Sequence, residues 1–255
     1  MTPSNVRVGT CGFTRSRRLI FTELDIVEIQ QTFYDPRVSS SLKRIKQEAP
    51  EDFEFSVKAW MLVTHKYNAK LWKRLKKPVP DNKEDYGFFQ DNEAVAWAWR
   101  ETINAAEAIG AKVIVLQTPA SFKPTKENVN RLSTFLSKHW PEGYTLAWEP
   151  RGEWWDRRDL LEGFNKEFGL LIAGDVLRGR MPPSGQDKLY TRLHGLGGAE
   201  VNYRYKYTVE DLQRLLDIVR SGGWEISYVL FNNVFSYEDA VAFKRLYESS
   251  TLNNP

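Results

Sequence analysis

Hydrophobic and polar positions alternate over short segments of this chain and recur every three to four residues over longer ones. Alternating or short apolar runs predict strands, whereas an apolar period near 3.6 residues predicts helices. Eight strands are predicted, over residues 6–10, 26–30, 53–58, 112–117, 144–149, 170–174, 189–193 and 226–231. Helices are predicted over residues 38–48, 93–109, 126–138, 156–168, 209–221 and 237–248, with a weaker one over 15–24. Thr208 and Ser236 are the predicted N-caps of the last two.

Strands and helices therefore take turns along the chain, which favours parallel strands joined by helical crossovers. Eight such units in 255 residues match a (β/α)₈ TIM barrel with a closed parallel sheet. The rival is an open doubly wound sheet, which normally carries a glycine-rich phosphate loop after its first strand. The segment here reads GTCGFTRSRR and has no such motif. We expect one barrel domain over residues 1–255, with a long loop after the third strand and an irregular connection after the sixth.

Composition narrows the class of protein. Hydrophobic residues make up 42% of the chain and charged residues 27%, which excludes a disordered protein. The single cysteine, Cys11, excludes a disulfide framework and a cysteine-rich zinc module. No apolar run approaches the roughly 20 residues of a membrane span, and the first residues do not resemble a signal peptide. We expect a cytoplasmic protein, monomeric and not bound to membranes, whose abundant aromatic residues mostly pack in the core.

Polar residues occupy one face of several predicted strands. Side chains alternate along a strand, so if the apolar set packs against the helices, the polar set points to the barrel axis. A buried charge costs several kcal/mol unless it is paired, so these residues must form ion pairs or line a wet pocket. Arg7 and Glu54 lie early in their strands and are expected to form a structural ion pair. Residues at the carboxyl ends are expected to be functional, because barrel active sites lie at that face.

Seven short motifs follow one another in a familiar order along the chain. They are VGTCGF near the start, EIQQTFY at 28–34, FSVKAW at 55–60 with Thr64-His65, LQTPASF at 116–122, WEPRGEWW at 148–155, YTRLHG at 190–195 and FNN at 231–233. Together they resemble the YecE-like family, also called domain of unknown function 72, over essentially the whole chain. The resemblance implies a TIM barrel. It implies no activity, so function has to be argued from the residues.

Several charged residues are expected to project from strand ends toward one mouth. Glu149 is the candidate general acid or base, and His194 is the candidate proton shuttle because histidine titrates near neutrality. Lys58 and Asp175 complete the predicted catalytic set. The predicted substrate-binding residues are Glu28, Gln30, Tyr34, Trp60, His65, Gln117, Arg151, Arg192, Asn232 and Asn233. Strand parity also predicts that Glu149, Arg192 and His194 converge, although His194 has the alternative role of a core histidine bonded to a carbonyl.

A divalent metal is an alternative feature of this mouth. Glu28, Glu149, Asp175 and His194 are residue types that bind Mg²⁺, Mn²⁺ or Zn²⁺. However, the chain has no HxH or HExxH spacing, and nearby cations compete for the same carboxylates. No other cofactor is predicted.

The segment of residues 66–91 is the longest predicted loop and is strongly basic. Its charged residues are seven basic (Lys66, Lys70, Lys73, Arg74, Lys76, Lys77 and Lys83) and four acidic (Asp81, Glu84, Asp85 and Asp91). The excess of three positive charges equals that of the whole chain. A functional interpretation is a lid that attracts an anionic substrate, with Trp60 and Trp72 stacking on a ring. The alternative is a solvated loop with no partner.

Three functions stay open at this point. The first is an enzyme, hydrolase-like or isomerase-like, that performs acid–base chemistry on an anionic, ring-bearing small molecule or nucleotide. The second is a nucleic-acid-binding or processing protein that uses the basic segment 66–91 and surface aromatic residues. The third is a barrel kept for a protein partner, which predicts an exposed apolar patch.

Overall fold

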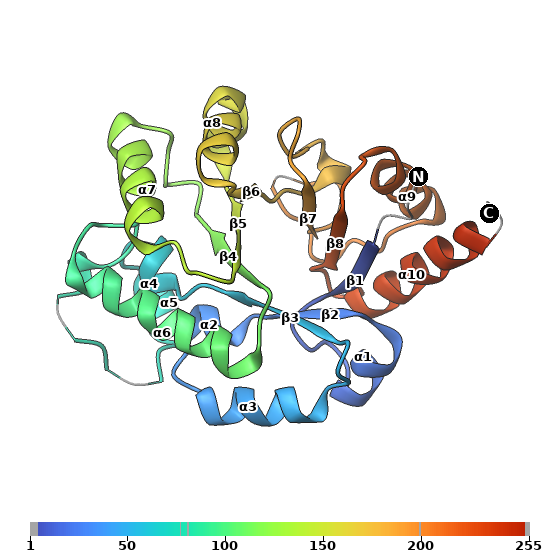
Figure 1. The fold of residues 1–255 in the computed structure, drawn as a ribbon, viewed down its shortest axis with the longest axis horizontal. Coiled ribbons are helices and arrows are strands. Elements are labelled where there is room, and N and C mark those ends of the chain that lie inside the picture. The colour runs from blue at the N-terminus through green and yellow to red at the C-terminus, as the bar shows by residue number, and fades with distance from the viewer. Residues whose placement is uncertain (1–4, 77, 81, 199, 253–255) are drawn as a thin grey trace. The chain divides into compact units, whose positions relative to one another are not determined.

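The computed structural model describes residues 5–76, 78–80, 82–198 and 200–252 (Figure 1). All eight predicted strands are present. They are β1 (Asn5–Cys11), β2 (Ile26–Ile29), β3 (Glu54–Lys58), β4 (Val113–Gln117), β5 (Thr145–Glu149), β6 (Leu171–Ile172), β7 (Lys188–Leu193) and β8 (Ile226–Phe231). They form one sheet in the order β6-β5-β4-β3-β2-β1-β8-β7, and every pairing described is parallel.

The pairing of β8 with β1 decides the fold class. Val8 lies opposite Val229 and Thr10 opposite Phe231, so the last strand is a neighbour of the first. A doubly wound sheet of this strand count does not bring its terminal strands together, whereas a barrel does. Directly after β6, Gly174 forms a further parallel bridge to Thr191 of β7. The fold is a (β/α)₈ barrel, as predicted.

The chain divides into two compact units. The first unit comprises Met1–Glu28, Pro50–Glu54 and Ala173–Pro255, and the second comprises Ile29–Ala49 and Phe55–Ile172. The single-domain expectation for residues 1–255 stays a prediction.

The long helices match their predicted ranges within a few residues. They are α1 (Arg17–Glu23), α3 (Ser39–Glu48), α6 (Glu93–Ile109), α7 (Lys126–His139), α8 (Arg158–Phe168), α9 (Val209–Ser221) and α10 (Ser236–Leu252). Three four-residue helices were not predicted, namely α2 (Gln31–Tyr34), α4 (Met61–Thr64) and α5 (Ala69–Trp72). Short 3₁₀ turns lie at Lys83–Asp85, Gly152–Asp156 and Val176–Arg178. In the described part of the chain, no helix combines the length and apolar character needed to cross a membrane.

One of the two predicted caps is confirmed. The Thr208 hydroxyl accepts from the Asp211 backbone N–H at 3.2 Å, and the Asp211 carboxylate accepts from the Thr208 N–H at 3.0 Å. This reciprocal pair satisfies two backbone donors at the start of α9. The Ser236 cap is wrong, because α10 begins at Ser236 itself. The Ser236 hydroxyl instead donates to Thr14 at 3.1 Å, within the first unit.

Tryptophans build much of the core of the second unit. Trp148 of β5 and Trp154 are both fully buried, and their rings meet edge to face at 4.8 Å. Each indole N–H has a partner, because Trp148 donates to the Thr118 hydroxyl at 3.1 Å and Trp154 donates to the Phe122 carbonyl. These contacts fix the backbone that follows β5, where the charged residues of the site begin.

The close approach of β1 and β2 gives a stability prediction. A methyl group on Gly9 would lie 1.9 Å from the Ile26 carbonyl oxygen, which is backbone and cannot move aside. Gly9→Ala is expected to destabilise the protein by about 3 kcal/mol or more in urea unfolding. The matched control is Gly163→Ala, on the exposed face of α8 with no atom near the added methyl. It is expected to be neutral or to stabilise the helix by up to about 1 kcal/mol. Equal stabilities for the two variants would contradict this account of β1.

Candidate functional site

The first unit buries a polar layer near the amino ends of its strands. Arg7 of β1 contacts Glu54 at 3.0 Å, and the Tyr228 hydroxyl donates to the second oxygen of Glu54 at 3.2 Å. Burial, followed by the charge of Glu54, raises the pKa of the Tyr228 phenol, so it is a hydrogen-bond donor at neutral pH. The predicted Arg7–Glu54 ion pair is confirmed, and its place in the strands makes it structural.

A second polar layer in the same unit contains Glu28, which is completely buried. Arg192 holds the Glu28 carboxylate with two hydrogen bonds, from Nε at 2.9 Å and from Nη2 at 2.8 Å. The Tyr190 hydroxyl donates to the same carboxylate at 3.0 Å. Arg192 is itself only 1% exposed. Strand parity predicted that Glu28 and Arg192 face inward. Their pairing offsets the free-energy cost of burying both charges.

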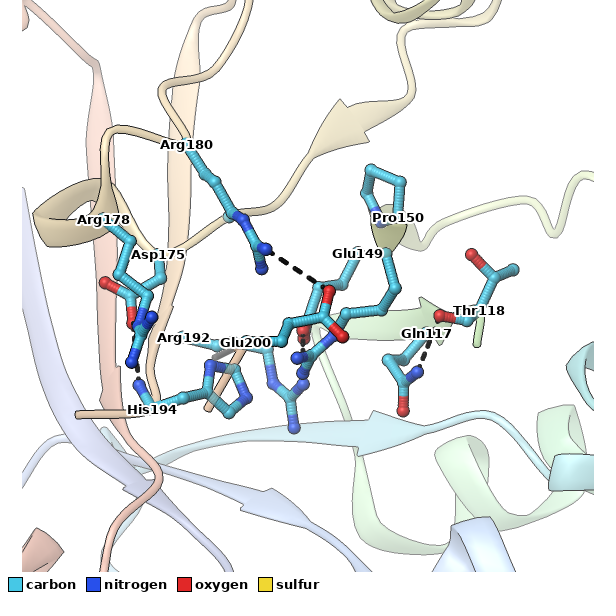
Figure 2. Close-up of polar contacts among 12 residues, drawn as sticks. Gln117, Thr118, Glu149, Pro150, Asp175, Arg178, Arg180, Arg192, His194 and Glu200 are labelled. Carbon is cyan, nitrogen blue, oxygen red and sulfur yellow. Dashed lines mark hydrogen bonds and ion pairs between the residues drawn. The ribbon is translucent and has the colours of Figure 1, made fainter. Parts of the chain in front are cut away.

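The carboxyl end of β7 is fixed by a network around Asp175. The Asp175 carboxylate accepts a hydrogen bond from the His194 backbone N–H at 2.9 Å (Figure 2). Arg178 lies 3.8 Å from the same carboxylate and donates to the Gly195 carbonyl at 2.7 Å. The Gly195 N–H in turn donates to the Tyr207 hydroxyl at 2.7 Å. Asp175 therefore positions the backbone that carries the buried His194.

Two residues that sequence reasoning did not single out lie beyond this network. Arg180 follows the 3₁₀ turn after β6, and its guanidinium contacts the Glu200 carboxylate at 3.3 Å (Figure 2). Both side chains keep part of their surface exposed. The signal that could have found them was the density of arginines in the predicted irregular connection, which held Arg178 and Arg180 within a few residues of Asp175.

In the second unit, the cation of Lys58 at the end of β3 lies next to the side-chain amide of Gln117 at the end of β4. The two strands are paired neighbours, and the Lys58 ammonium donates to the Gln117 side-chain oxygen at 2.8 Å. The Gln117 side-chain nitrogen donates to the Thr118 carbonyl at 2.8 Å (Figure 2), which fixes the orientation of the amide. The Lys58 ammonium also lies 3.8 Å from the centre of the Phe33 ring, a cation–π contact.

The end of β5 carries a buried ion pair. Glu149 is 3% exposed and Arg151 is 8% exposed, and their side chains contact each other directly. Two residues apart on an extended segment, they lie on the same side of the backbone, which lets the guanidinium reach the carboxylate. Glu149 is thus paired with Arg151, and Arg192 is paired with Glu28. The expected convergence of Glu149, Arg192 and His194 stays a prediction.

Burial and two cations of the second unit shift the pKa of His65. Burial, and then the positive charges of Lys58 and Arg151, lower the pKa of the His65 imidazole from 6.5 to about 3. Its Nδ1 lies 2.8 Å from the Thr64 hydroxyl. The imidazole is therefore neutral at physiological pH. Lys58, His65, Gln117, Glu149 and Arg151 are called the β3–β5 cluster below.

Some predicted substrate-binding residues have structural contacts instead. Trp60 is fully buried, its indole N–H donates to the Tyr34 carbonyl at 2.9 Å, and the Arg37 guanidinium lies 4.9 Å from its ring. Its predicted stacking on a substrate ring is wrong, because the ring has no exposed surface. The side-chain nitrogen of Asn233 donates to the Tyr205 carbonyl and to Asp239, so it ties the end of β8 to α10.

The remaining predicted binding residues are partly accessible. The Tyr34 ring is half-buried and lies 3.9 Å from the guanidinium of Arg74. Gln30 and Asn232 are also half-buried, and the Asn232 backbone N–H donates to the Leu193 carbonyl at 2.8 Å. Their roles in binding stay predictions.

The described residues contain no ligand set for the divalent metal considered above. Among the described residues, no three His, Cys, Asp or Glu side chains are grouped so as to hold a metal ion. Glu28, the first candidate ligand, already receives two donors from Arg192 and one from Tyr190. These residues do not fit a metal centre.

Comparison with known proteins places the chain in a family. The model for "Protein of unknown function DUF72" matches residues 16–254. The chain belongs to the DUF72 family. No curated protein matches its sequence significantly.

Solved structures agree with this assignment. A DUF72 family protein from Enterococcus faecalis V583 is 18% identical, with a TM-score of 0.71 over 97% of this chain and 99% of that one. Two structures of other kinds share the fold. They are 3-keto-D-glucoside 4-epimerase from E. coli (12% identity, TM-score 0.59, 95% and 99% covered) and endonuclease IV from Thermus thermophilus (11% identity, TM-score 0.52, 98% and 100% covered). At these identities the likeness concerns the fold alone.

The buried carboxylate of this DUF72 protein gives a second prediction. Glu28→Gln leaves the buried Arg192 guanidinium facing a neutral amide, and the expected loss of stability is about 3–5 kcal/mol in urea unfolding. The control is Glu153→Gln, which removes an exposed ion pair with Lys123 and is expected to cost less than about 1 kcal/mol. A loss of stability no larger than that of the control would mean that the Glu28 pair is solvated.

The lowered pKa of His65 gives a third prediction. The folded imidazole binds a proton only near pH 3, whereas the unfolded one does so near 6.5. The stabilisation is therefore complete above about pH 6.5 and is lost as the pH falls toward 3. The free energy of unfolding of the native DUF72 protein should fall more steeply between pH 6.5 and 4 than that of His65→Gln. Imidazole NMR provides the direct check, and a His65 resonance that titrates near pH 6.5 would contradict the assignment.

Proposed function

We propose that this DUF72 protein is an enzyme that performs acid–base chemistry on an anionic, ring-bearing small molecule. The observation that carries the proposal is the β3–β5 cluster, in which a neutral histidine is influenced by two cations beside a buried carboxylate. These residues lie at or just beyond the carboxyl ends of their strands, where active sites of (β/α)₈ enzymes are found.

Lys58 and Arg151 are the proposed anion-binding residues. Lys58 donates to the Gln117 amide, and, second to burial, its positive charge contributes to the lowered pKa of His65. Arg151 presents a planar guanidinium, which suits the oxygens of a carboxylate or a phosphate. Gln117 and neutral His65 add groups that bind hydroxyls of a ring substituent.

Glu149 is the proposed general base and acid. Its contact with Arg151 favours the ionised carboxylate, the form that accepts a proton from carbon or from water. His194 lies in the first unit, where Asp175 positions it by accepting a hydrogen bond from its backbone N–H, and its role as a proton shuttle stays a prediction. Proton transfer of this kind serves isomerisation or hydrolysis. The fold likeness to a protein named 3-keto-D-glucoside 4-epimerase supports isomerisation of a sugar-like ring.

Solvent deuterium exchange tests this proposal. The protein is incubated in D₂O with a panel of sugar phosphates and sugar acids, and loss of carbon-bound protons is followed by NMR. The active compound should lose a single proton signal at a rate that Glu149→Gln lowers by at least about 100-fold. Lys58→Met should weaken its binding about tenfold or more. Lys112→Met, at an exposed cation before β4, is the control and should leave both quantities unchanged.

The same variants separate this proposal from the nucleic-acid alternative. If the protein exchanges no proton and instead binds oligonucleotides with steep salt dependence and full tolerance of Glu149→Gln, the acid–base proposal fails. Exchange at the native rate in Glu149→Gln would reject Glu149 as the base.

A further inference from the structure

A wide-open surface pocket of about 520 Å³, called the cavity below, lies within the basic segment of residues 66–91, in the second unit. Its apolar wall includes Trp72, Leu75 and Val79, and its charged residues among those described are Lys76 and Lys83. Pockets of roughly 300–1,000 Å³ are typical for small ligands. Lys77 and Asp81 of the same segment lie outside the described residues.

Buried groups outside the segment hold its backbone in place. The Asp35 carboxylate is nearly fully buried and accepts from the Lys76 backbone N–H at 3.1 Å. Arg37 pairs with Asp35 through two nitrogens and donates to the Pro78 carbonyl at 2.8 Å. Burial opposes ionisation of Asp35, but the bonds from Arg37 and Lys76 outweigh it and lower the pKa of the carboxyl. The cavity wall is thus anchored at neutral pH.

Aromatic rings hold the side chains that line the cavity. The Trp72 ring meets Tyr67 edge to face at 5.2 Å and Tyr86 at 5.8 Å. Tyr86 is fully buried, and its hydroxyl donates to the Pro80 carbonyl. The Lys83 ammonium lies 4.3 Å from the centre of the Tyr67 ring, the same ring that meets Trp72. Trp72 and Lys83 thus share an aromatic neighbour, and both line the cavity.

We propose that this cavity binds a nucleotide. The lining combines an indole, which stacks on a planar base, with two ammonium groups, which bind a phosphate. Lys76 and Lys83 are the charged residues of the described lining, and both suit an anionic group. The same chemistry is presented by a free mononucleotide and by one nucleotide of a single-stranded nucleic acid. The inference does not depend on Glu149 or on the proposed isomerase activity.

Calorimetry with matched probes tests whether both halves of the ligand are recognised. Adenosine monophosphate is expected to bind the full-length protein. Adenosine, which lacks the phosphate, and ribose 5-phosphate, which lacks the base, should each bind at least about tenfold more weakly. Equal affinity for ribose 5-phosphate and the nucleotide would overturn the proposal, because the indole would then contribute nothing.

Variants locate the binding to this cavity. The double variant Lys76→Ala, Lys83→Ala is expected to weaken nucleotide binding about tenfold or more, and Trp72→Ala to weaken it to a similar degree. The control is Lys70→Ala, Lys73→Ala, which removes two exposed cations of the same segment that do not line the cavity. Equal losses in the two double variants would reject the site. Because Trp72→Ala removes ring contacts that support the segment, the lysine variants decide the question if it unfolds.

A short deoxyadenosine oligonucleotide identifies the source of the nucleotide. Binding much tighter than that of the monophosphate, with the same dependence on Lys76 and Lys83, points to a single strand, and equal affinity points to the free nucleotide. Absence of binding by both probes overturns the proposal. Wild-type nucleotide binding by Glu149→Gln, in a variant that has lost proton exchange, would separate this site from the acid–base chemistry.

Discussion

Charge buried away from the protein surface is the constraint on which the rest of this barrel depends. Ordinary barrels fill their interior with branched aliphatic side chains, which need no partners. Here Glu28 and Arg192 occupy such positions with almost no exposed surface, so each must satisfy the other. Two parallel hydrogen bonds between guanidinium and carboxylate, with a tyrosine hydroxyl beside them, meet that demand. In this layer, the buried carboxylate is therefore accommodated together with its hydrogen-bond donors.

The β3–β5 cluster gathers charge at the other end of the strands. Lys58 donates to the Gln117 amide and Arg151 contacts Glu149, and burial and the two cations lower the pKa of His65. The Arg7–Glu54 pair lies near the amino ends of its strands, whereas this cluster lies at the carboxyl ends. The proposed binding of an anion uses these cations at the face where barrel active sites lie.

The periodicity of hydrophobic residues in strands and helices was sufficient to predict most of the fold. All eight strands and the long helices lie close to their predicted ranges, because each repeats its pattern over enough residues to be read. The four-residue helices α2 and α4 are too short to show a period. Parity along strands placed Glu28, Lys58 and Arg192 correctly as inward-facing, but it does not assign partners. The Arg151 contact with Glu149 and the burial of Trp60 depend on local packing after a strand has ended, which alternation does not encode.

Asp35 gives the basic segment an unusual dependence on one distant position. The buried Asp35 carboxylate accepts a hydrogen bond from the Lys76 backbone N–H and pairs with Arg37. Arg37 in turn donates a hydrogen bond to the Pro78 carbonyl. The shape of the cavity is therefore specified outside the segment that lines it. The side chains that line the cavity can be substituted while these backbone contacts are kept. Ligand preference can therefore diverge among relatives without a change of backbone. Asp35 would be the residue that limits this freedom, although it does not line the cavity.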